Sequence, residues 1–342
     1  MHRTVMPRGV TPRNATTWRA LLVATALLAA QALSLPAAFA QADYPSRPIT
    51  YVVPYPPGGA ADVFARQLAQ KLSERLKQPV VIDNRPGANG NIGSAAVAKG
   101  AADGYTILLG SASTIAINPH LYGKAMPYDP IKDLAPVSGT HSMANVLVVN
   151  TATPYRTVQD VIKAAKEKPG ALAYASAGNG NTMHLAGEQF RMQSGIDLLH
   201  VPYKGGPPAL NDVLAGQVPM MFNNLPAVVP LVKSGRLRAL AIATPQRSRL
   251  LPEVPTMEEA GLKGYVSTVW NGIFVKTGTP APMVERLSRE IKAVLDTPEM
   301  RQSLDEQGFD PIPSTPEQFA ALIRAEYPRW ADVVQKSGAK ID

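Results

Sequence analysis

From residue 49 onward, the chain repeats one pattern of apolar and polar positions. A short apolar run rich in β-branched residues is followed by a loop of glycine, proline or asparagine, and then by a segment with helical periodicity. The first unit consists of Ile49–Val53, a Pro/Tyr/Gly loop, and a segment in which Phe64 and three leucines recur every four residues. This spacing gives one apolar face to a helix that begins near Ala61. The pattern therefore predicts strands and helices that alternate along the chain.

The same pattern extends toward the C-terminus. The predicted strands are Ile49–Val53, Val80–Ile82, Tyr105–Leu109, Val146–Val149, Ala171–Ser176, Ile196–Pro202, Val218–Phe222, Leu237–Ala243 and Val269–Val275. The predicted helices begin near Ala61, after the loop 84–93 and at Thr157, and continue with Thr182–Gln193, Pro207–Leu214, Ala227–Lys233, Ala281–Leu295 and Pro316–Lys336. Apolar strands that alternate with helices are typical of parallel sheets covered on both faces, so we expect an α/β fold.

The N-terminal segment has a different composition from the rest. Four arginines and no acid lie within its first nineteen residues, Ala20–Ala30 forms an apolar run, and Ala38-Phe39-Ala40 fits the A-x-A rule for signal peptidase. The alternative is an N-terminal membrane anchor, but the run is shorter than the roughly 20 apolar residues that a spanning helix needs. We therefore predict a signal peptide, residues 1–40, that is cleaved after Ala40 during export.

The remaining composition limits the class of protein. The four arginines of the N-terminal segment supply half of the formal net charge of +8, and no basic block follows, so nucleic acid is not expected as a partner. The chain has no cysteine, so an exported protein of this sequence depends on a hydrophobic core and has no disulfide or Cys-based metal site. Its length exceeds one typical domain, and the elements show no clean break. Two lobes connected by more than one crossing of the chain are expected.

Catalytic motifs are weak. The histidines after the predicted cleavage site, His120, His141, His184 and His200, show no H-E-x-x-H spacing, and neither a G-x-S-x-G elbow nor a phosphate-binding G-K-[ST] motif is present. The glycines of the loop 84–93 do not match the G-x-G-x-x-G spacing of a dinucleotide site. The sequence therefore predicts a protein that is not an enzyme and that needs no cofactor or metal.

Two glycine-rich loops carry the remaining chemistry. Pro57-Gly58-Gly59 precedes one predicted helix, and Gly178-Asn179-Gly180-Asn181 precedes another. Glycine lets the backbone approach a ligand closely, and free N–H groups at a helix start attract anions. Two such loops facing each other across a cleft would clamp a small carboxylate. The alternative is that each loop only turns the chain between a strand and a helix.

At this point the chain resembles the Bug/TctC family, the periplasmic solute-binding proteins of tripartite tricarboxylate transporters. The similarity covers essentially the whole exported chain, and its motifs follow in the family's order. These motifs are YPSRPI at 44–49, VPYPPGG at 53–59 with Asp62, DNRPGANG at 83–90, DGYTIL at 103–108, VPYKGG at 201–206, LAGQV at 214–218, RLRALA at 236–241 and LPEVPT at 251–256.

The resemblance implies the periplasmic binding protein-like II fold, or Venus flytrap, with two doubly wound α/β lobes around a ligand cleft. Lobe 1 would be discontinuous, with residues 41–142 and 270–342, and lobe 2 would comprise residues 143–269. The chain crossings at 142–148 and 266–272 would form the hinge. Members typically hold a small organic carboxylate through backbone amides, hydroxyls and ordered waters. The family also implies a periplasmic location and membrane transporter subunits, or a sensor protein, as partners; we expect a monomer.

The candidate ligand-binding residues combine these loops with polar residues at predicted strand ends. They are Tyr55, Pro57, Gly58, Gly59, Asp62, Ser111, Ser113, Ser176, Gly178, Asn179, Gly180, His184, Tyr203, Lys204, Gly205 and Asn223. An acid beside a carboxylate would repel it, so Asp62 is expected to order its loop or a water, or to face a polar group of the ligand. The hydroxyl residues could equally be helix caps, and His184 a packed side chain. Lys204 could neutralise the ligand or simply be exposed.

Two further positions modify this prediction. Members of the family often carry an acid after the Met-Met-Phe strand, where this chain has Asn223, which argues against a ligand amine paired with an acid there. Trp270 lies near the expected hinge, and core packing is its stronger interpretation. The predicted function is capture of a small organic carboxylate for a membrane transporter. The alternatives are an exported hydrolase that uses a loop serine on a carboxylic ester or amide, and an interaction module without a small ligand.

Overall fold

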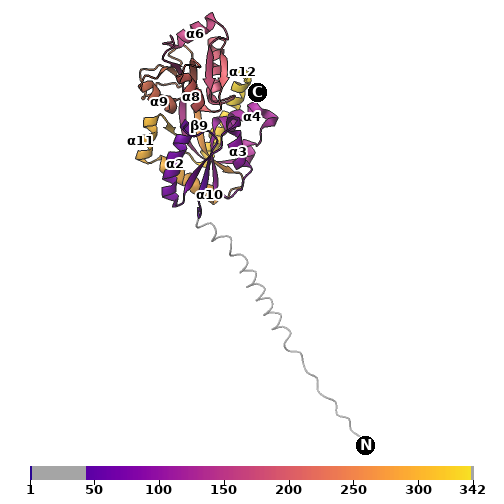
Figure 1. Ribbon diagram of the computed structural model, residues 1–342. Coiled ribbons are helices and arrows are strands. Elements are labelled where there is room, and N and C mark those ends of the chain that lie inside the picture. The colour runs from indigo at the N-terminus through magenta and orange to yellow at the C-terminus, as the bar shows by residue number, and fades with distance from the viewer. Residues whose placement is uncertain (2–43, 340–342) are drawn as a thin grey trace. The chain divides into compact units, whose positions relative to one another are not determined.

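The computed structural model describes Met1 and residues 44–339, shown as coloured ribbon in Figure 1. The predicted signal peptide and its cleavage site after Ala40 lie outside the described residues. Within the described part, no helix is long and apolar enough to cross a membrane. Of the described residues, 45–339 form one compact unit, which contains every helix and strand discussed below.

The strands of this unit pair into one mixed sheet. Their bounds are β1 (Ile49–Val53), β2 (Val80–Asn84), β3 (Thr106–Ser111), β4 (Leu134–Asn150), β5 (Ala173–Ser176), β6 (Leu199–Pro202), β7 (Met220–Asn224), β8 (Leu237–Ile242), β9 (Thr268–Lys276) and β10 (Asp310–Pro311). The order across the sheet is β2-β1-β3-β9-β4-β7-β5-β6, and β8 and β10 both pair with β4. The sheet therefore has a group of strands at each end, β1–β3 and β5–β7, with β9 and β4 between them.

The prediction of parallel sheets is right at the two ends and wrong in the middle. β1 pairs in parallel with β2 and β3, and β5 pairs in parallel with β6 and β7. By contrast, β9 is antiparallel to β3 and β4, and β4 is antiparallel to β7, β8 and β10. The ladder between β4 and β9 runs from the pair Leu134 and Lys276 to the pair Ala144 and Thr268. The two strands that pass between the end groups are thus hydrogen-bonded to each other.

Helices surround this sheet. Their bounds are α2 (Ala60–Leu76), α3 (Asn91–Ala98), α4 (Asn118–Tyr122), α5 (Pro130–Asp133), α6 (Val158–Glu167), α7 (Thr182–Ser194), α8 (Gly206–Leu214), α9 (Leu225–Lys233), α10 (Ala281–Leu295), α11 (Pro298–Gln307) and α12 (Pro316–Ser337), with short turns at η1 (Ala88–Gly90), η2 (Ser113–Ile117) and η3 (Gly123–Ala125). Figure 1 shows α6, α8 and α9 at one end of the unit and α2, α3 and α10 at the other, with β9 between. The mixed α/β fold is the one expected.

Apolar clusters in the described core pack against both strand groups. One contains Val146 to Val149 of β4 with buried side chains of β5, β7, β8 and helices α6 to α9. Another joins β1, β3 and β9 with α12, where Trp270 lies edge-on to Phe319 at 5.6 Å between ring centres. Trp270 is therefore a packed residue, as its stronger interpretation predicted. Leu185 of α7 belongs to this second cluster. Helix α7 follows β5 in one end group and is therefore also packed against the other end group, β1–β3.

Candidate ligand-binding cleft

A cavity of about 910 Å³ lies where the parallel strands of both end groups terminate. Its wall contains residues 54–56 after β1, 86–90 after β2, Ser111 and Ser113 at the end of β3, 177–179 after β5, 203–206 after β6, and Asn223, Asn224, Pro226 and Ala227 at the end of β7. Met143 of β4, and Val269 and Asn271 of β9, complete the wall between the two groups. In open α/β sheets this edge, beyond the carboxyl ends of the strands, is where ligands bind.

The charge of the wall suits an anion. Among the described residues that line the cavity, Lys204 is the only one with a full charge at neutral pH, and Asp, Glu, Arg and His are absent. Helices α2, α8 and α9 begin at this wall, at Gly59, Gly205 and Asn224, without a side-chain cap in the described structure. Uncapped helix starts carry a partial positive charge and present the backbone N–H groups of their first turn, except at Pro207 and Pro208 of α8 and Pro226 of α9, which have none. The wall therefore attracts a negative group without an acidic side chain to oppose it.

The first glycine-rich loop is fixed by Asp62, which lies behind it. The Asp62 carboxylate is 3% exposed and accepts hydrogen bonds from the Gly58 amide at 2.9 Å, from Arg66 at 2.9 and 3.0 Å, and from Asn84 at 2.9 Å. Burial raises the pKa of Asp62, but these hydrogen bonds outweigh it and hold the pKa below its usual value. Asp62 is not part of the cavity wall. Its position agrees with the loop-ordering role considered for it.

Hydroxyl groups lie at the end of β3. The Tyr55 and Ser111 hydroxyls are 2.6 Å apart, and the Ser111 amide donates to Thr114 Oγ1 at 3.0 Å. Burial raises the pKa of Tyr55, which stays a neutral hydrogen-bonding group. Tyr55, Ser111 and Ser113 all line the cavity. The strand-end hydroxyls thus lie in the wall as well as in the local turn.

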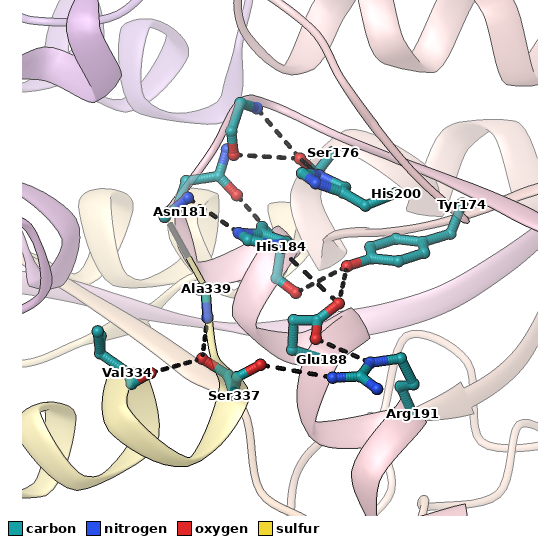
Figure 2. A network of polar contacts seen from close by, with 12 residues as sticks. Tyr174, Ser176, Asn181, His184, Glu188, Arg191, His200, Val334, Ser337 and Ala339 are labelled. Atoms are coloured by element: carbon teal, nitrogen blue, oxygen red, sulfur yellow. Dashed lines mark hydrogen bonds and ion pairs between the residues drawn. The ribbon is translucent and has the colours of Figure 1, made fainter. Parts of the chain in front are cut away.

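The imidazole rings of His184 and His200 contact the second glycine-rich loop, Ala177–Asn181, and the serine before it; Figure 2 shows both rings. The Gly180 amide donates to His184 Nδ1 at 2.9 Å, and Ser176 Oγ lies 2.6 Å from His200 Nε2. His184 is 5% exposed, and its burial, with Arg191 nearby, lowers its pKa to about 4. Gly178 and Asn179 line the cavity, whereas Ser176, Gly180 and His184 do not.

The sequence analysis expected the two glycine-rich loops to face each other across the cleft. In the structure they do not face each other directly. A Cβ on Gly205 would lie 2.6 Å from Pro56 Cγ, and Gly59 lies opposite Pro207, so the first loop faces the start of α8. A Cβ on Gly180 would overlap Leu121, so the second loop faces α4 instead. Both loops nevertheless border the same cavity, and at these points the two strand groups are in contact across it.

The structure gathers most of the candidate residues in one wall. Those that line the cavity are Tyr55, Gly58, Gly59, Ser111, Ser113, Gly178, Asn179, Tyr203, Lys204, Gly205 and Asn223. Those that lie outside the wall are Pro57, Asp62, Ser176, Gly180 and His184. Asn223 is buried, and its Oδ1 accepts from the Asn224 amide at 2.8 Å. In the described residues, no group of three or more acids and histidines could hold a metal ion.

Among the wall residues that were not predicted to bind the ligand, two asparagines have an unpaired side-chain donor. Asn181 and Asn271 are buried, and their side-chain amide nitrogens make no hydrogen bond within the described part of the chain. A buried donor without a partner is costly, so a bound polar group would stabilise the site. Asn271 could have been found as the polar residue that interrupts the apolar run Val269–Val275.

Comparison with known proteins identifies close relatives. The model of the tripartite tricarboxylate transporter family receptor, TctC, matches residues 64–339. Rpa4515 of R. palustris, solved with adipate, is 37% identical with a TM-score of 0.84 and covers 87% of this chain and 99% of its own. The periplasmic binding protein BugD is 33% identical, with a TM-score of 0.82 and the same coverage. MatC of Rhodopseudomonas palustris, with bound malate, is 32% identical, with a TM-score of 0.80, over 85% of this chain and 100% of its own.

Proposed function

Because the chain belongs to the tripartite tricarboxylate transporter receptor family, we propose that it captures a small organic carboxylate in this cavity and delivers it to membrane transporter subunits of the tripartite type. Proteins of this family are periplasmic binding proteins for transporters and not enzymes, and this chain is one of them. The observation that carries the proposal is the wall itself: three uncapped helix starts and Lys204 surround a cavity without a described acidic side chain.

The contacts proposed for the ligand follow from the wall. The backbone amides of Gly59 and Gly205, the hydroxyls of Tyr55, Ser111 and Ser113, and Lys204 would bind a carboxylate, while the Gly58 amide stays bound to Asp62. Gly178, Asn179, Tyr203 and Asn223 would contact it from the second strand group. The unpartnered amides of Asn181 and Asn271 would gain a hydrogen bond. Adipate and malate, bound by Rpa4515 and MatC, define the size range to test first.

The proposed mechanism is closure of two lobes, 41–142 with 270–342 and 143–269. The hinge would lie where β4 and β9 pair, at Ser142 with Trp270 and Ala144 with Thr268. A ligand that contacts both lobes binds the closed state more tightly and shifts the population toward it. The close approaches of Gly205 to Pro56 and of Gly59 to Pro207 are the contacts that such a closed state would make.

The proposed location is the periplasm, reached by cleavage after Ala40. Intact-mass measurement of protein from that compartment should give a chain that starts at Gln41, and a mass that retains residues 1–40 would contradict the proposal.

A serine hydrolase has one observation in its favour, the short distance between Ser176 and His200. However, Ser176 is fully buried, lies outside the cavity wall, and already exchanges hydrogen bonds with the Gly178 amide and carbonyl. A nucleophile must reach its substrate, and this hydroxyl does not. The Ser176–His200 pair supports the loop and not catalysis.

The test is a binding measurement on the chain from Gln41. Adipate and malate are titrated beside their dimethyl esters, with calorimetry for affinity and thermal unfolding for stabilisation. A specific acid at 100 times its Kd should stabilise the protein by about 2.7 kcal/mol, and its ester should bind at least about tenfold more weakly because the helix starts favour a charge. Equal affinity for acid and ester would overturn the carboxylate proposal. An unchanged small-angle scattering profile at saturating acid would overturn lobe closure.

A further inference from the structure

The loop Ala177–Asn181 is fixed at both ends by side chains that do not reach the cavity. At its start, Ser176 Oγ accepts from the Gly178 amide at 3.2 Å and donates to the Gly178 carbonyl at 3.1 Å. His200 Nε2 lies 2.6 Å from Ser176 Oγ. At its end, the Gly180 amide donates to His184 Nδ1 at 2.9 Å. Between these anchors lie Gly178 and Asn179, which line the cavity.

His184 also takes part in the cap of α7. The His184 amide donates to Asn181 Oδ1 at 2.9 Å while the His184 ring accepts from the Gly180 amide. This reciprocal pair resembles a capping box, in which Gln or Glu at the same helical position accepts from a backbone amide before the helix. Here an imidazole replaces the Gln or Glu side chain. The loop and the helix start are thereby held as one piece.

The two imidazoles support each other. The rings of His184 and His200 are stacked, with centres 3.9 Å apart and planes 11° from parallel, and Figure 2 shows them one above the other. They come from α7 and β6, so the stack connects the helix that begins the site with a strand of the same end group. A shift of either ring would move an anchor of the loop.

The charge on His184 is set by its surroundings. A backbone amide can only donate, so Nδ1 must be unprotonated, and the ring proton lies on Nε2, which is 4.0 Å from Glu188 Oε1. The Glu188 carboxylate accepts hydrogen bonds from Tyr174 of β5 at 2.8 Å and from Arg191 at 2.9 Å. The other titratable neighbour of the His184 ring is His200 of β6. From α12, the Ser337 carbonyl accepts a hydrogen bond from Arg191 at 3.4 Å. Burial and Arg191 lower the pKa of His184 to about 4.

We propose that His184 is a positioning residue for ligand binding: its neutral ring, stacked on His200, holds the loop Ala177–Asn181 in the conformation that contacts the carboxylate. This inference rests on the proposed function of the cavity. Protonation of Nδ1 removes the acceptor of the Gly180 amide and places two N–H donors face to face. Affinity for a carboxylate should therefore fall in acid for a reason that lies in the protein and not in the ligand.

Two replacements of His184 separate positioning from simple packing. His184→Gln keeps an acceptor that does not titrate, and His184→Leu keeps the bulk but has no acceptor. With malate or adipate as the probe, whichever binds the wild type, His184→Leu should raise Kd at least tenfold at pH 7, and His184→Gln should stay within about threefold. Between pH 7 and pH 4, where His184 becomes protonated, the increase in Kd should be smaller for His184→Gln than for the wild type. His120→Gln serves as the matched control, because His120 contacts Tyr327 and not the cavity wall.

A readout without ligand keeps the inference testable by itself. Hydrogen exchange of the Gly180 amide should be slow in the wild type and in His184→Gln, and fast in His184→Leu. Nitrogen-15 spectra of the wild-type imidazole should show an unprotonated Nδ1. Gly180 exchange and probe affinity that are unchanged in a folded His184→Leu protein would overturn the inference. If no organic acid binds even the wild type, the proposed function fails, while the exchange experiment still decides the positioning of the loop.

Discussion

In each of the two glycine-rich loops of the cavity, a side chain fixes the backbone through a hydrogen bond. The side chain is charged in the first loop and neutral in the second. The loop at Gly58 is held by an ionised carboxylate, Asp62, whose charge is matched by Arg66 on the same helix. The loop at Gly180 is held by the neutral ring of His184. In both cases the supporting side chain lies behind the backbone and outside the cavity wall. A polar loop beside an anion site can thus be made rigid without adding a charge to the site.

The difference between the loops lies in their response to acid. Hydrogen bonds hold the pKa of Asp62 below its usual value, so the first loop keeps its anchor well into the acid range. The second loop loses its acceptor when His184 gains a proton, near pH 4. The first anchor is stabilised by charge, and the second depends on the absence of charge. Three experiments test this difference between the loops.

The largest expected effect is acid destabilisation through His184. Its pKa is about 4 in the folded chain and about 6.5 in the unfolded chain, so the unfolded chain binds the proton first as the pH falls. This contribution is complete above about pH 7 and is lost between pH 6.5 and pH 4, an effect of about 3 kcal/mol. Denaturant unfolding at pH 7 and pH 4 should therefore show a smaller pH dependence for His184→Gln than for the wild type. Equal pH dependence in the two proteins would mean that this imidazole titrates normally.

The second experiment removes the charged anchor. Asp62→Ala leaves the Gly58 amide without its acceptor and removes one of the two acceptors of the Asn84 side-chain amide, so it should lower the free energy of unfolding by about 2 kcal/mol. It should also weaken carboxylate binding, because the Gly58 backbone lines the cavity. Asp160→Ala is the matched control: Asp160 accepts from two backbone amides at the start of α6, away from the cavity. The control should lose some stability and no affinity, and a loss of affinity in both proteins would contradict the local explanation.

The sequence predicted the fold well where apolar periodicity decides the structure. α10 has the predicted bounds, and α6 has the capping box expected from Thr157 and Asp160. α11 was missed because only Met300 and Leu304 of its ten residues are buried, which leaves almost no periodic signal. The first half of β4 was missed because it contains buried polar residues, including Ser138 and His141, that are strand only through pairing with β9 and β10. Tertiary pairing, and not propensity, determines that strand.

The loops of the site were also predictable, but not their partners. A glycine-rich turn between a strand and a helix is a local feature, so Gly58, Gly59, Gly178 and Gly205 could be found in the sequence. Which loop faces which depends on how the strand groups pack, and for this reason Gly205 lies opposite Pro56 while Gly180 lies opposite Leu121. The stack of His184 on His200 joins residues of two elements, and no sequence motif at either residue predicts the contact.

The smallest expected effect concerns the contact that these loops make across the cavity. Gly205→Ala would place a Cβ 2.6 Å from Pro56 Cγ and should hinder closure, so we expect a roughly tenfold weaker affinity for the carboxylate, about 1.4 kcal/mol. Gly205 has a φ of 121°, so backbone strain alone could also weaken binding. The double variant with Pro56→Ala separates the two causes, because it removes the obstacle and keeps the strain. Gly264→Ala, at a φ of 68° with no atom within 4 Å of its Cβ, should leave affinity unchanged. Recovered affinity in the double variant supports closure of Gly205 onto Pro56, whereas no recovery would assign the loss to the loop itself.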